Sequence, residues 1–504
     1  MNPLVVLGLD AADPDLLMAW AKEGCLPTIA SLMEKGCWAN LSGPELICEH
    51  GIWVSLFSGI SRGDHGYYYL RQLKPGTYKL QTMHGEKLQV PPFWSFFKAK
   101  KSFIMDVPDS FPINGVDGIQ IGNWAIHNMI VPDWSEPKEL LGYIRSHFGP
   151  RMQVEEKQES SHFQDRLILR ELIKRVAVKG DLCRHLLQNQ RFDLVAAVFC
   201  ESHTATHQFW KYHLHGQNGE KASEEAGLTH AIRDVYQAID REIGLLLTQM
   251  PQDANIFLIS STGMRDQYSF RYLIEDFCIK LGYQATKLPS PSLRPLDMAR
   301  RLVPQSWRIA LSRSLGRETR EGLLSDYFEK STDWCKTTAF AIPSAFTSFI
   351  RVNLRGREPQ GIIEKGSQYE SLLNQLEEDL NKLIDPKTGK PAVEEVQRTT
   401  TLFGKEASIS LPDIFVNWKP TTYFVDKVIH PKAVLTQEKP EFFRKNDHTR
   451  SGWLVAQGPA IKHLGAIGNV SLLDLVPTFL RILGEPTPAY LKGKLIQTML
   501  TPPL

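Results

Sequence analysis

The stretch from Leu194 to Trp210 reads LVAAVFCESHTATHQFW. Its first six residues are all apolar, which is typical of a strand buried on both faces of a parallel sheet. His203 and His207 follow, and if the chain turns into a helix there, both imidazoles lie on one helix face with Cβ atoms about 5–6 Å apart. Rings at that spacing reach a common metal ion, although surface or capping histidines give the same pattern. The stretch predicts a strand, a helix and a candidate metal pair after the strand.

A second apolar run, Leu4 to Leu9, predicts another buried strand and ends on Asp10. The pattern after it predicts a helix from Asp13 to Lys35, with Gly36 just past its end. In open α/β sheets, ligands bind beyond the carboxyl ends of the strands, which is where Asp10 falls. Aspartate at this place is also a common helix cap, so a functional and a structural role both stay open.

Composition narrows the class of protein. The 504 residues hold 42% hydrophobic and 23% charged residues, as in ordinary globular proteins. Lysine and arginine number 58 against 56 acidic residues, which argues against nucleic acid or an anionic membrane as a partner. The seven cysteines lack paired spacing, which favours a reducing compartment, by default the cytoplasm. Neither a basic leader nor an 18-residue apolar run stands out, so we expect no export and no membrane span.

The segment from Ser42 to Gly66 carries a resemblance, through Trp53, the pair Ser58-Gly59 and the sequence GDHG at 63–66. It resembles the nucleophile region of the type I phosphodiesterase and nucleotide pyrophosphatase family, a branch of the alkaline phosphatase superfamily. Similar landmarks follow in order at Val107–Gly122, Val352–Gly361, Asp385–Gly389, Leu411–Ile414 and Ser471–Leu480. The resemblance implies a three-layer α/β/α sandwich of the alkaline phosphatase type. It also implies one catalytic domain over residues 1–504, with cap segments at about 67–94 and 284–336.

Two departures from the family pattern stand out. The family holds two metal ions, and a threonine between them attacks phosphorus; the alignment puts Glu49 at that threonine's position. The Asp-His pair of the second metal falls on Ser261 and Thr262, whose hydroxyls are poor ligands for a zinc-like ion. The resemblance therefore implies a divergent member that lacks the nucleophile and the second metal site, with Asp10 as that site's unchanged residue.

The first metal site of the family falls on His203, His207 and His448, with histidine at 203 in place of aspartate. Three neutral imidazoles leave a divalent ion its full charge and open positions. We expect one divalent transition metal ion; zinc suits this set, and so do iron, manganese, cobalt and copper. Glu49 is expected near the ion, as a fourth ligand or as a general base. The alternative for Glu49 is a salt bridge to a nearby lysine or arginine.

Glu49 and Asp10 are the candidate catalytic residues. His50, Trp124, His127 and Trp210 are candidates for substrate binding from resemblance and position, although a buried histidine bonded to a backbone carbonyl is equally compatible with His50.

The expected function is hydrolysis of an anionic small molecule, a phosphate, phosphonate or sulfate derivative, by metal-activated water with Glu49 as base. One alternative is a redox or lyase enzyme with a three-histidine iron, manganese, cobalt or copper centre. The other is a catalytically retired binding protein.

Overall fold

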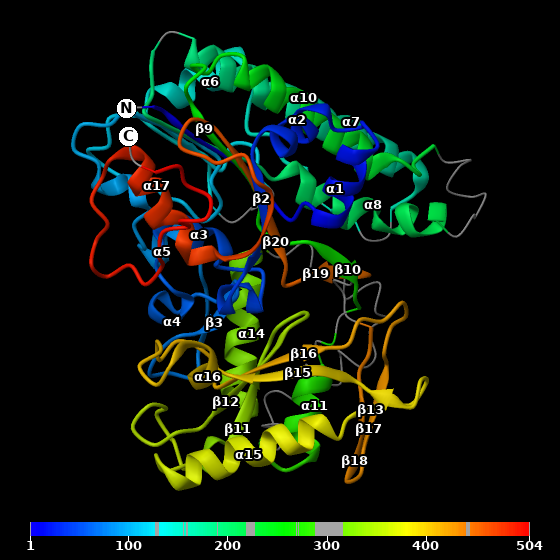
Figure 1. The fold of residues 1–504 in the computed structure, drawn as a ribbon. Helices are drawn as coiled ribbons and strands as arrows, with labels where there is room; N and C mark the ends of the chain where they lie inside the picture. The colour runs from blue at the N-terminus through cyan, green and yellow to red at the C-terminus, as the bar shows by residue number, and fades with distance from the viewer. Residues whose placement is uncertain are drawn as a thin grey trace. The chain divides into compact units, whose positions relative to one another are not determined.

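The computed structural model describes residues 2–502 except 127–130, 155, 158, 159, 189, 218–226, 269, 271, 288–315 and 440–443. The chain forms two compact units (Figure 1). Unit 1 comprises Met1–Ser61, His84–Arg265 and His448–Leu504, and unit 2 comprises Arg62–Met83 and Asp266–Asp447.

Unit 1 is built on a nine-stranded sheet in the order β21-β2-β20-β9-β1-β8-β5-β6-β7. The strands are β1 (Leu4–Leu9), β2 (Cys37–Ser42), β5 (Ser102–Met105), β6 (Gly118–Gly122), β7 (Trp134–Glu136), β8 (Leu194–Phe199), β9 (Asn255–Ser260), β20 (Gly452–Gln457) and β21 (Gly465–Ser471). The central strands β9, β1, β8, β5 and β6 run parallel, whereas β20 and β7 pair antiparallel to their neighbours. The two predicted strands are confirmed as β1 and β8, which lie side by side with Leu9 opposite Phe199. Asp10 and the start of the histidine stretch therefore lie together at the carboxyl ends of two adjacent central strands.

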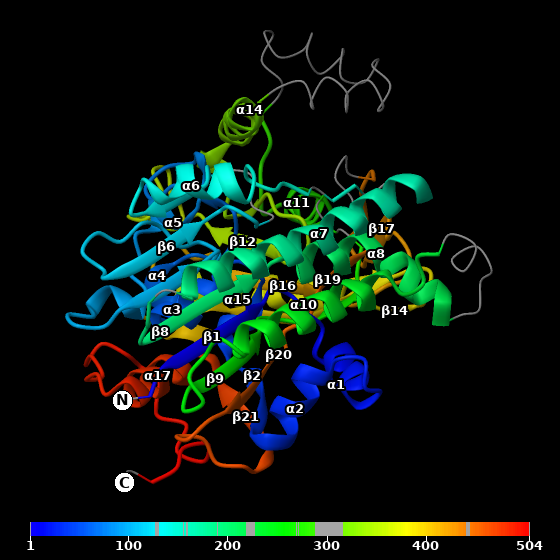
Figure 2. The ribbon, with the colours of Figure 1, turned by 90° about the horizontal axis from the view of Figure 1, so that it is seen from above.

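Helices cover both faces of this sheet (Figure 2). They are α1 (Pro14–Lys22), α2 (Pro27–Lys35), α3 (Ile52–Ser58), α5 (Gly85–Leu88), α6 (Leu140–His147), α7 (His162–Leu187), α8 (Glu201–Gln217), α10 (Ala231–Leu247) and α17 (Leu475–Leu483). Alternate residues of β1 pack into different cores: Val5 and Leu7 join the apolar residues of α1, α2, α7 and α10, while Leu4 and Val6 join those of α3 and α17. The predicted three-layer α/β/α architecture is confirmed.

The helix predicted from Asp13 to Lys35 was wrong in its length. The structure has two helices there, because Gly24 takes the left-handed conformation, with φ of +79°, and Pro27 begins the second helix. Asp13 caps the first helix by accepting a hydrogen bond from the Leu16 amide at 3.1 Å.

A glycine in β1 allows a tryptophan to lie against the sheet. A Cβ atom added at Gly8 would meet Cη2 of Trp53 at 2.5 Å, so only glycine admits the indole at this distance. Trp53 belongs to α3, and its indole Nε1 donates to Oδ1 of Asp10 at 2.7 Å. The close approach thus connects α3 to the residue that ends β1.

Unit 2 holds two four-stranded antiparallel sheets and a hairpin. Its strands are β3 (Arg71–Leu73), β4 (Leu80–Thr82), β11 (Ala339–Ile342), β12 (Ser348–Val352), β13 (Ile384–Asp385), β14 (Lys390–Pro391), β15 (Val393–Arg398), β16 (Ile414–Trp418), β17 (Lys427–His430) and β18 (Ala433–Thr436). Its helices are α4 (Arg62–His65), α11 (Leu273–Lys280), α14 (Arg317–Ser331), α15 (Ser367–Asn381) and α16 (Thr399–Phe403). Two short strands, β10 (Met264–Asp266) and β19 (Asn446–His448), contain the boundaries between the units.

The expected cap segments divide between the units. The hairpin β3-β4 lies in the first segment, whose residues 67–83 belong to unit 2 and whose residues 84–94 belong to unit 1. Most of the second segment, 288–315, lies outside the described residues. A single catalytic domain with two caps stays a prediction.

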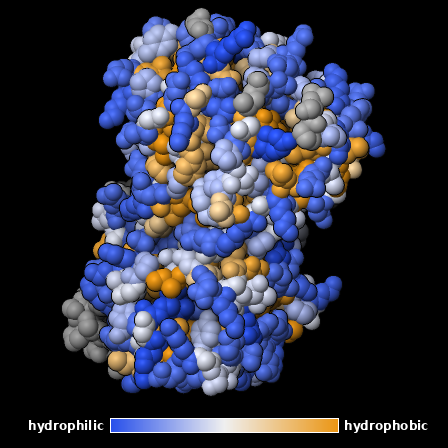
Figure 3. All heavy atoms as spheres, turned by 60° about the vertical axis from the view of Figure 1, so that its left-hand side comes forward, coloured by the Kyte–Doolittle hydropathy of each residue, from blue (hydrophilic) through white to orange (hydrophobic). Residues whose placement is uncertain are grey.

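Polar side chains cover most of the face seen in Figure 3, and apolar ones form separate patches on it. Among the described helices, none is long and apolar enough to cross a membrane.

Candidate metal centre

Two of the candidate ligands lie on the first turns of α8. This helix begins at Glu201, directly after β8, as the sequence pattern predicted. His203 and His207 lie one turn apart on it, and their ring centroids are 4.8 Å apart. Both side chains are buried, with 7% and 5% of their surface exposed.

His448, at the end of β19, completes a group of three imidazoles. Its ring centroid lies 4.9 Å from each of the other two, and its Nε2 lies 3.2 Å from Nε2 of His207. The residue that follows, Thr449, holds this segment against the loop after β9: its amide donates to the Gly263 carbonyl and its hydroxyl accepts from the Gly263 amide, both at 3.1 Å. Hydrogen bonds between loops thus bring together histidines that lie 241 residues apart.

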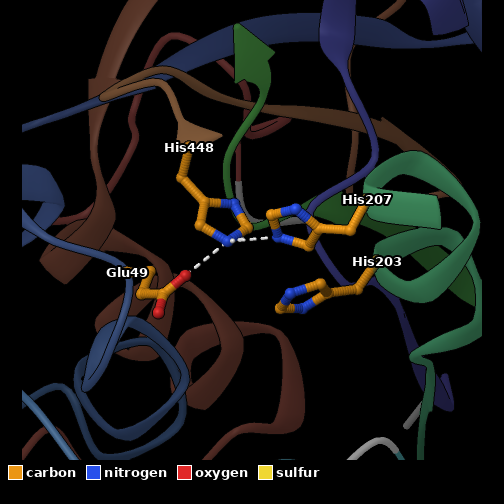
Figure 4. A group of neighbouring side chains, drawn as sticks. All are labelled: Glu49, His203, His207 and His448. Carbon is orange, nitrogen blue, oxygen red and sulfur yellow. Dashed lines mark hydrogen bonds and ion pairs between the residues drawn. The ribbon is translucent and has the colours of Figure 1, made fainter. Parts of the chain in front are cut away.

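Glu49 is the fourth member of the group (Figure 4). It precedes Gly51, whose φ of +84° makes the tight turn into α3. One carboxylate oxygen, Oε2, forms an ion pair with Nε2 of His448, and the other, Oε1, lies 3.3 Å from Nε2 of His50. The carboxylate is 22% exposed, so it is the member of the group most open to solvent.

The geometry of this group fits a transition metal ion. The four residues each offer a ligand atom, and these atoms all lie within 4.8 Å of one another. Zinc–nitrogen bonds of about 2.0–2.1 Å at tetrahedral angles separate two ligand nitrogens by about 3.3–3.4 Å, close to the 3.2 Å between His207 and His448. Three buried imidazoles and a carboxylate are also a donor set that zinc and its neighbours prefer.

Asp10 contacts His203, but it does not belong to the four-residue cluster. Its Oδ2 lies 2.9 Å from Nδ1 of His203, and its Oδ1 accepts hydrogen bonds from Trp53 and, at 3.2 Å, from the Ser261 hydroxyl. The carboxylate is buried, at 5% exposure. Both oxygens of this carboxylate are thus bonded to protein groups, and its catalytic role stays a prediction.

The hydroxyls at the expected second metal site bond to the protein. Ser261 Oγ accepts from the Ala11 amide at 3.0 Å, in addition to its bond to Asp10. The Thr262 hydroxyl donates to the Thr449 carbonyl. These contacts give both hydroxyls a structural role.

A fully buried charge network supports the start of α8, and the sequence analysis missed it. Glu201 Oε1 lies 2.7 Å from Nε of Arg175 and 3.7 Å from Nζ of Lys179, which also lies 3.0 Å from Asp106. Lys179 donates to the Val198 carbonyl in β8 as well, at 2.7 Å. Burial alone would lower the pKa of Lys179, but the two carboxylates outweigh it and raise that pKa. The signal in the sequence was two cations four residues apart in α7.

The four candidates for substrate binding lie in different surroundings. His50 is partly exposed beside Glu49. Trp124 is fully buried in the core of unit 1, and its role in substrate binding stays a prediction. Trp210 is buried on α8 with its ring centroid 5.6 Å from that of His213, and its role stays a prediction. His127 lies outside the described residues.

Comparisons with known proteins add the following. The profile described as "Type I phosphodiesterase / nucleotide pyrophosphatase" matches residues 4–291. A comparison with curated proteins gave no match. Similar solved structures include murine ectonucleotide pyrophosphatase/phosphodiesterase 5, at 12% identity and a TM-score of 0.48, and the human protein, at 11% and 0.49. An inactive form of the murine protein in complex with AMP gives 12% and 0.49. Each of these three covers 99% of this chain and 100% of its own.

Proposed function

Because the chain belongs to the type I phosphodiesterase / nucleotide pyrophosphatase family, we propose that it is a hydrolase that uses one divalent metal ion, held by His203, His207 and His448. The single observation that carries the proposal is the cluster of these three imidazoles with Glu49, all within 4.8 Å of one another. The family match supports hydrolytic chemistry, and the donor set supports the metal.

The contacts of the neighbouring residues support one ion instead of two. At the positions where the family resemblance implied further ligands, Ser261 and Thr262 bond to protein atoms. Asp10 accepts hydrogen bonds at both carboxylate oxygens. A second ion would have to displace these bonds and would find hydroxyls in place of a carboxylate and an imidazole.

Glu49 is the proposed general base. When bound, the ion supplies a Lewis acid and lowers the pKa of a coordinated water molecule to about 7. Glu49 is partly exposed while the histidines are buried, so its carboxylate lies on the solvent side of the cluster, where it can accept a proton from the attacking water. Direct attack by this carboxylate on phosphorus would give a labile acyl phosphate, which disfavours the nucleophilic role of the family threonine.

The proposed substrate is an anionic small molecule, a phosphate, phosphonate or sulfate derivative. Three neutral imidazoles leave the divalent charge of the ion uncancelled, and the Glu49 carboxylate offsets half of it. An anionic ester group is therefore attracted to the centre.

The experiment compares the wild-type protein with Glu49→Gln, which keeps the size of the side chain and removes its basic carboxylate. Both are loaded with zinc, manganese, cobalt or ferrous ion and assayed on chromogenic aryl phosphodiesters, phosphomonoesters, phosphonates and sulfates. We expect the wild type to hydrolyse at least one ester class, and the variant to lose about 10²–10⁴-fold in rate while still binding one ion. A wild-type rate in the variant, or no hydrolysis by the wild type with any ion, contradicts the proposal.

A second candidate function rests on the same donor set. Three imidazoles with one nearby carboxylate also suit iron, manganese, cobalt or copper in redox or lyase chemistry. Turnover that requires a redox-active ion and oxygen, and is absent with zinc, would favour this candidate. Failure to bind any of these ions at micromolar concentration would favour a retired binding protein.

A further inference from the structure

In the hydrogen bonds at Oδ1 of Asp10, the donor and the acceptor are known. The indole N–H of Trp53 can only donate, so Oδ1 of Asp10 is the acceptor of their 2.7 Å bond. Ser261 Oγ accepts from the Ala11 amide and donates to the same oxygen. These two donors fix the carboxylate plane and leave Oδ2 facing Nδ1 of His203 at 2.9 Å.

This arrangement selects one tautomer of His203. An ionised carboxylate only accepts, so Nδ1 of His203 must carry the proton of this bond. In the neutral ring, Nε2 then keeps its lone pair, which is what a metal ligand needs. The ring is held from α8 on one side and from the end of β1 on the other.

We propose that Asp10 is a positioning residue for the metal centre: it holds His203 with its proton on Nδ1 and its Nε2 lone pair toward the ion. In the family pattern Asp10 would bind the second metal ion directly, whereas here it would orient a ligand of the single ion. This inference rests on the proposed metal centre. Trp53 and Ser261 act indirectly, because their hydrogen bonds orient the carboxylate of Asp10.

The test variant is Asp10→Asn, which keeps the size of the side chain. Trp53 can only donate, so it forces the amide oxygen toward the indole and the NH₂ group toward His203. The ring must then accept at Nδ1 and carry its proton on Nε2, which disfavours coordination because metal binding has to break this arrangement. We expect metal affinity to fall about 10–100-fold.

Two further variants separate orientation from general damage. Asp13→Asn is the matched control, because Asp13 is also buried near the end of β1 but bonds to the amides of Leu16 and Met264. We expect it to bind the ion as tightly as the wild type. Adding Trp53→Phe to Asp10→Asn removes the donor that fixes the amide, so the amide can turn its oxygen to His203 and affinity should partly return.

The measurements are zinc affinity by competition with a chromogenic chelator and the tautomer of His203 in the metal-free wild type, read from the ¹⁵N shifts of its ring. If the wild type binds no ion, the proposed function fails. If it binds one ion, but Asp10→Asn binds as tightly or the wild-type ring carries its proton on Nε2, the positioning role alone is overturned. The shift measurement uses the wild-type fold, so it decides the matter even if Asp10→Asn does not fold.

Discussion

Replacing His207 with alanine tests the metal centre through stability. Its Nε2 lies 3.2 Å from that of His448, so the two nitrogens either share a proton or point at a common ion. His207→Ala removes one of the three imidazoles proposed as ligands. The variant and the wild type are each compared with their own metal-free form, so that the cost of the cavity left by the ring cancels.

The expected loss of zinc affinity in His207→Ala follows from the number of ligands. Structural zinc sites with four ligands bind with about 10–16 kcal/mol at neutral pH, or about 2.5–4 kcal/mol for each ligand. Losing one ligand thus weakens the dissociation constant by about 10²–10³-fold. At an ion concentration 100 times the wild-type dissociation constant, the wild type gains about 2.7 kcal/mol and the variant less than about 0.5 kcal/mol.

The assay is thermal unfolding with and without zinc, followed by metal analysis after dialysis. His213→Ala is the matched control, because His213 lies on α8 and its ring contacts Trp20 and Trp210 outside the cluster. We expect this control to keep the full zinc-induced shift. An equal shift in His207→Ala would refute the assignment of His207 as a ligand.

Two further predictions concern the scaffold. Lys179→Met leaves two carboxylates buried without their ammonium partner and should destabilise the protein by about 3–5 kcal/mol in urea unfolding; a loss below about 1 kcal/mol would contradict the role of the network. In unit 2, burial and the neighbouring Arg62 lower the pKa of His65 to about 3, against an ordinary value of 6.5. Between these two pH values the unfolded chain binds more protons at His65 than the folded chain does. The free energy of unfolding is therefore not reduced by His65 above pH 6.5, and it decreases as pH falls from 6.5 toward 3. His65→Asn should flatten that slope, and an unchanged slope would show that His65 does not cause it.

Much of the fold could be predicted from the sequence because periodicity reports burial directly. The apolar runs at Leu4–Leu9 and Leu194–Phe199 form adjacent central strands, and the helix after the second run carries both histidines. The helix predicted from Asp13 to Lys35 overran its true end, because a left-handed Gly24 interrupts an otherwise continuous pattern.

The site was harder to predict because its partners are distant in sequence. His448 was identified from family resemblance, since no local pattern connects it to His207 across 241 residues. The bonds from Asp10 to Trp53 and Ser261 depend on side-chain directions that spacing does not encode. The aromatic character of Trp124 suits a pocket wall and a core equally well, so the sequence did not reveal that its side chain is fully buried.

Anomalous scattering from a crystal of the zinc-loaded protein would show whether His203, His207 and His448 hold a single metal ion. We expect one ion per chain, bonded to imidazole nitrogens of His203, His207 and His448 at about 2.0–2.1 Å. Two ions per chain, with one on Asp10, or an ion bound elsewhere, would contradict it.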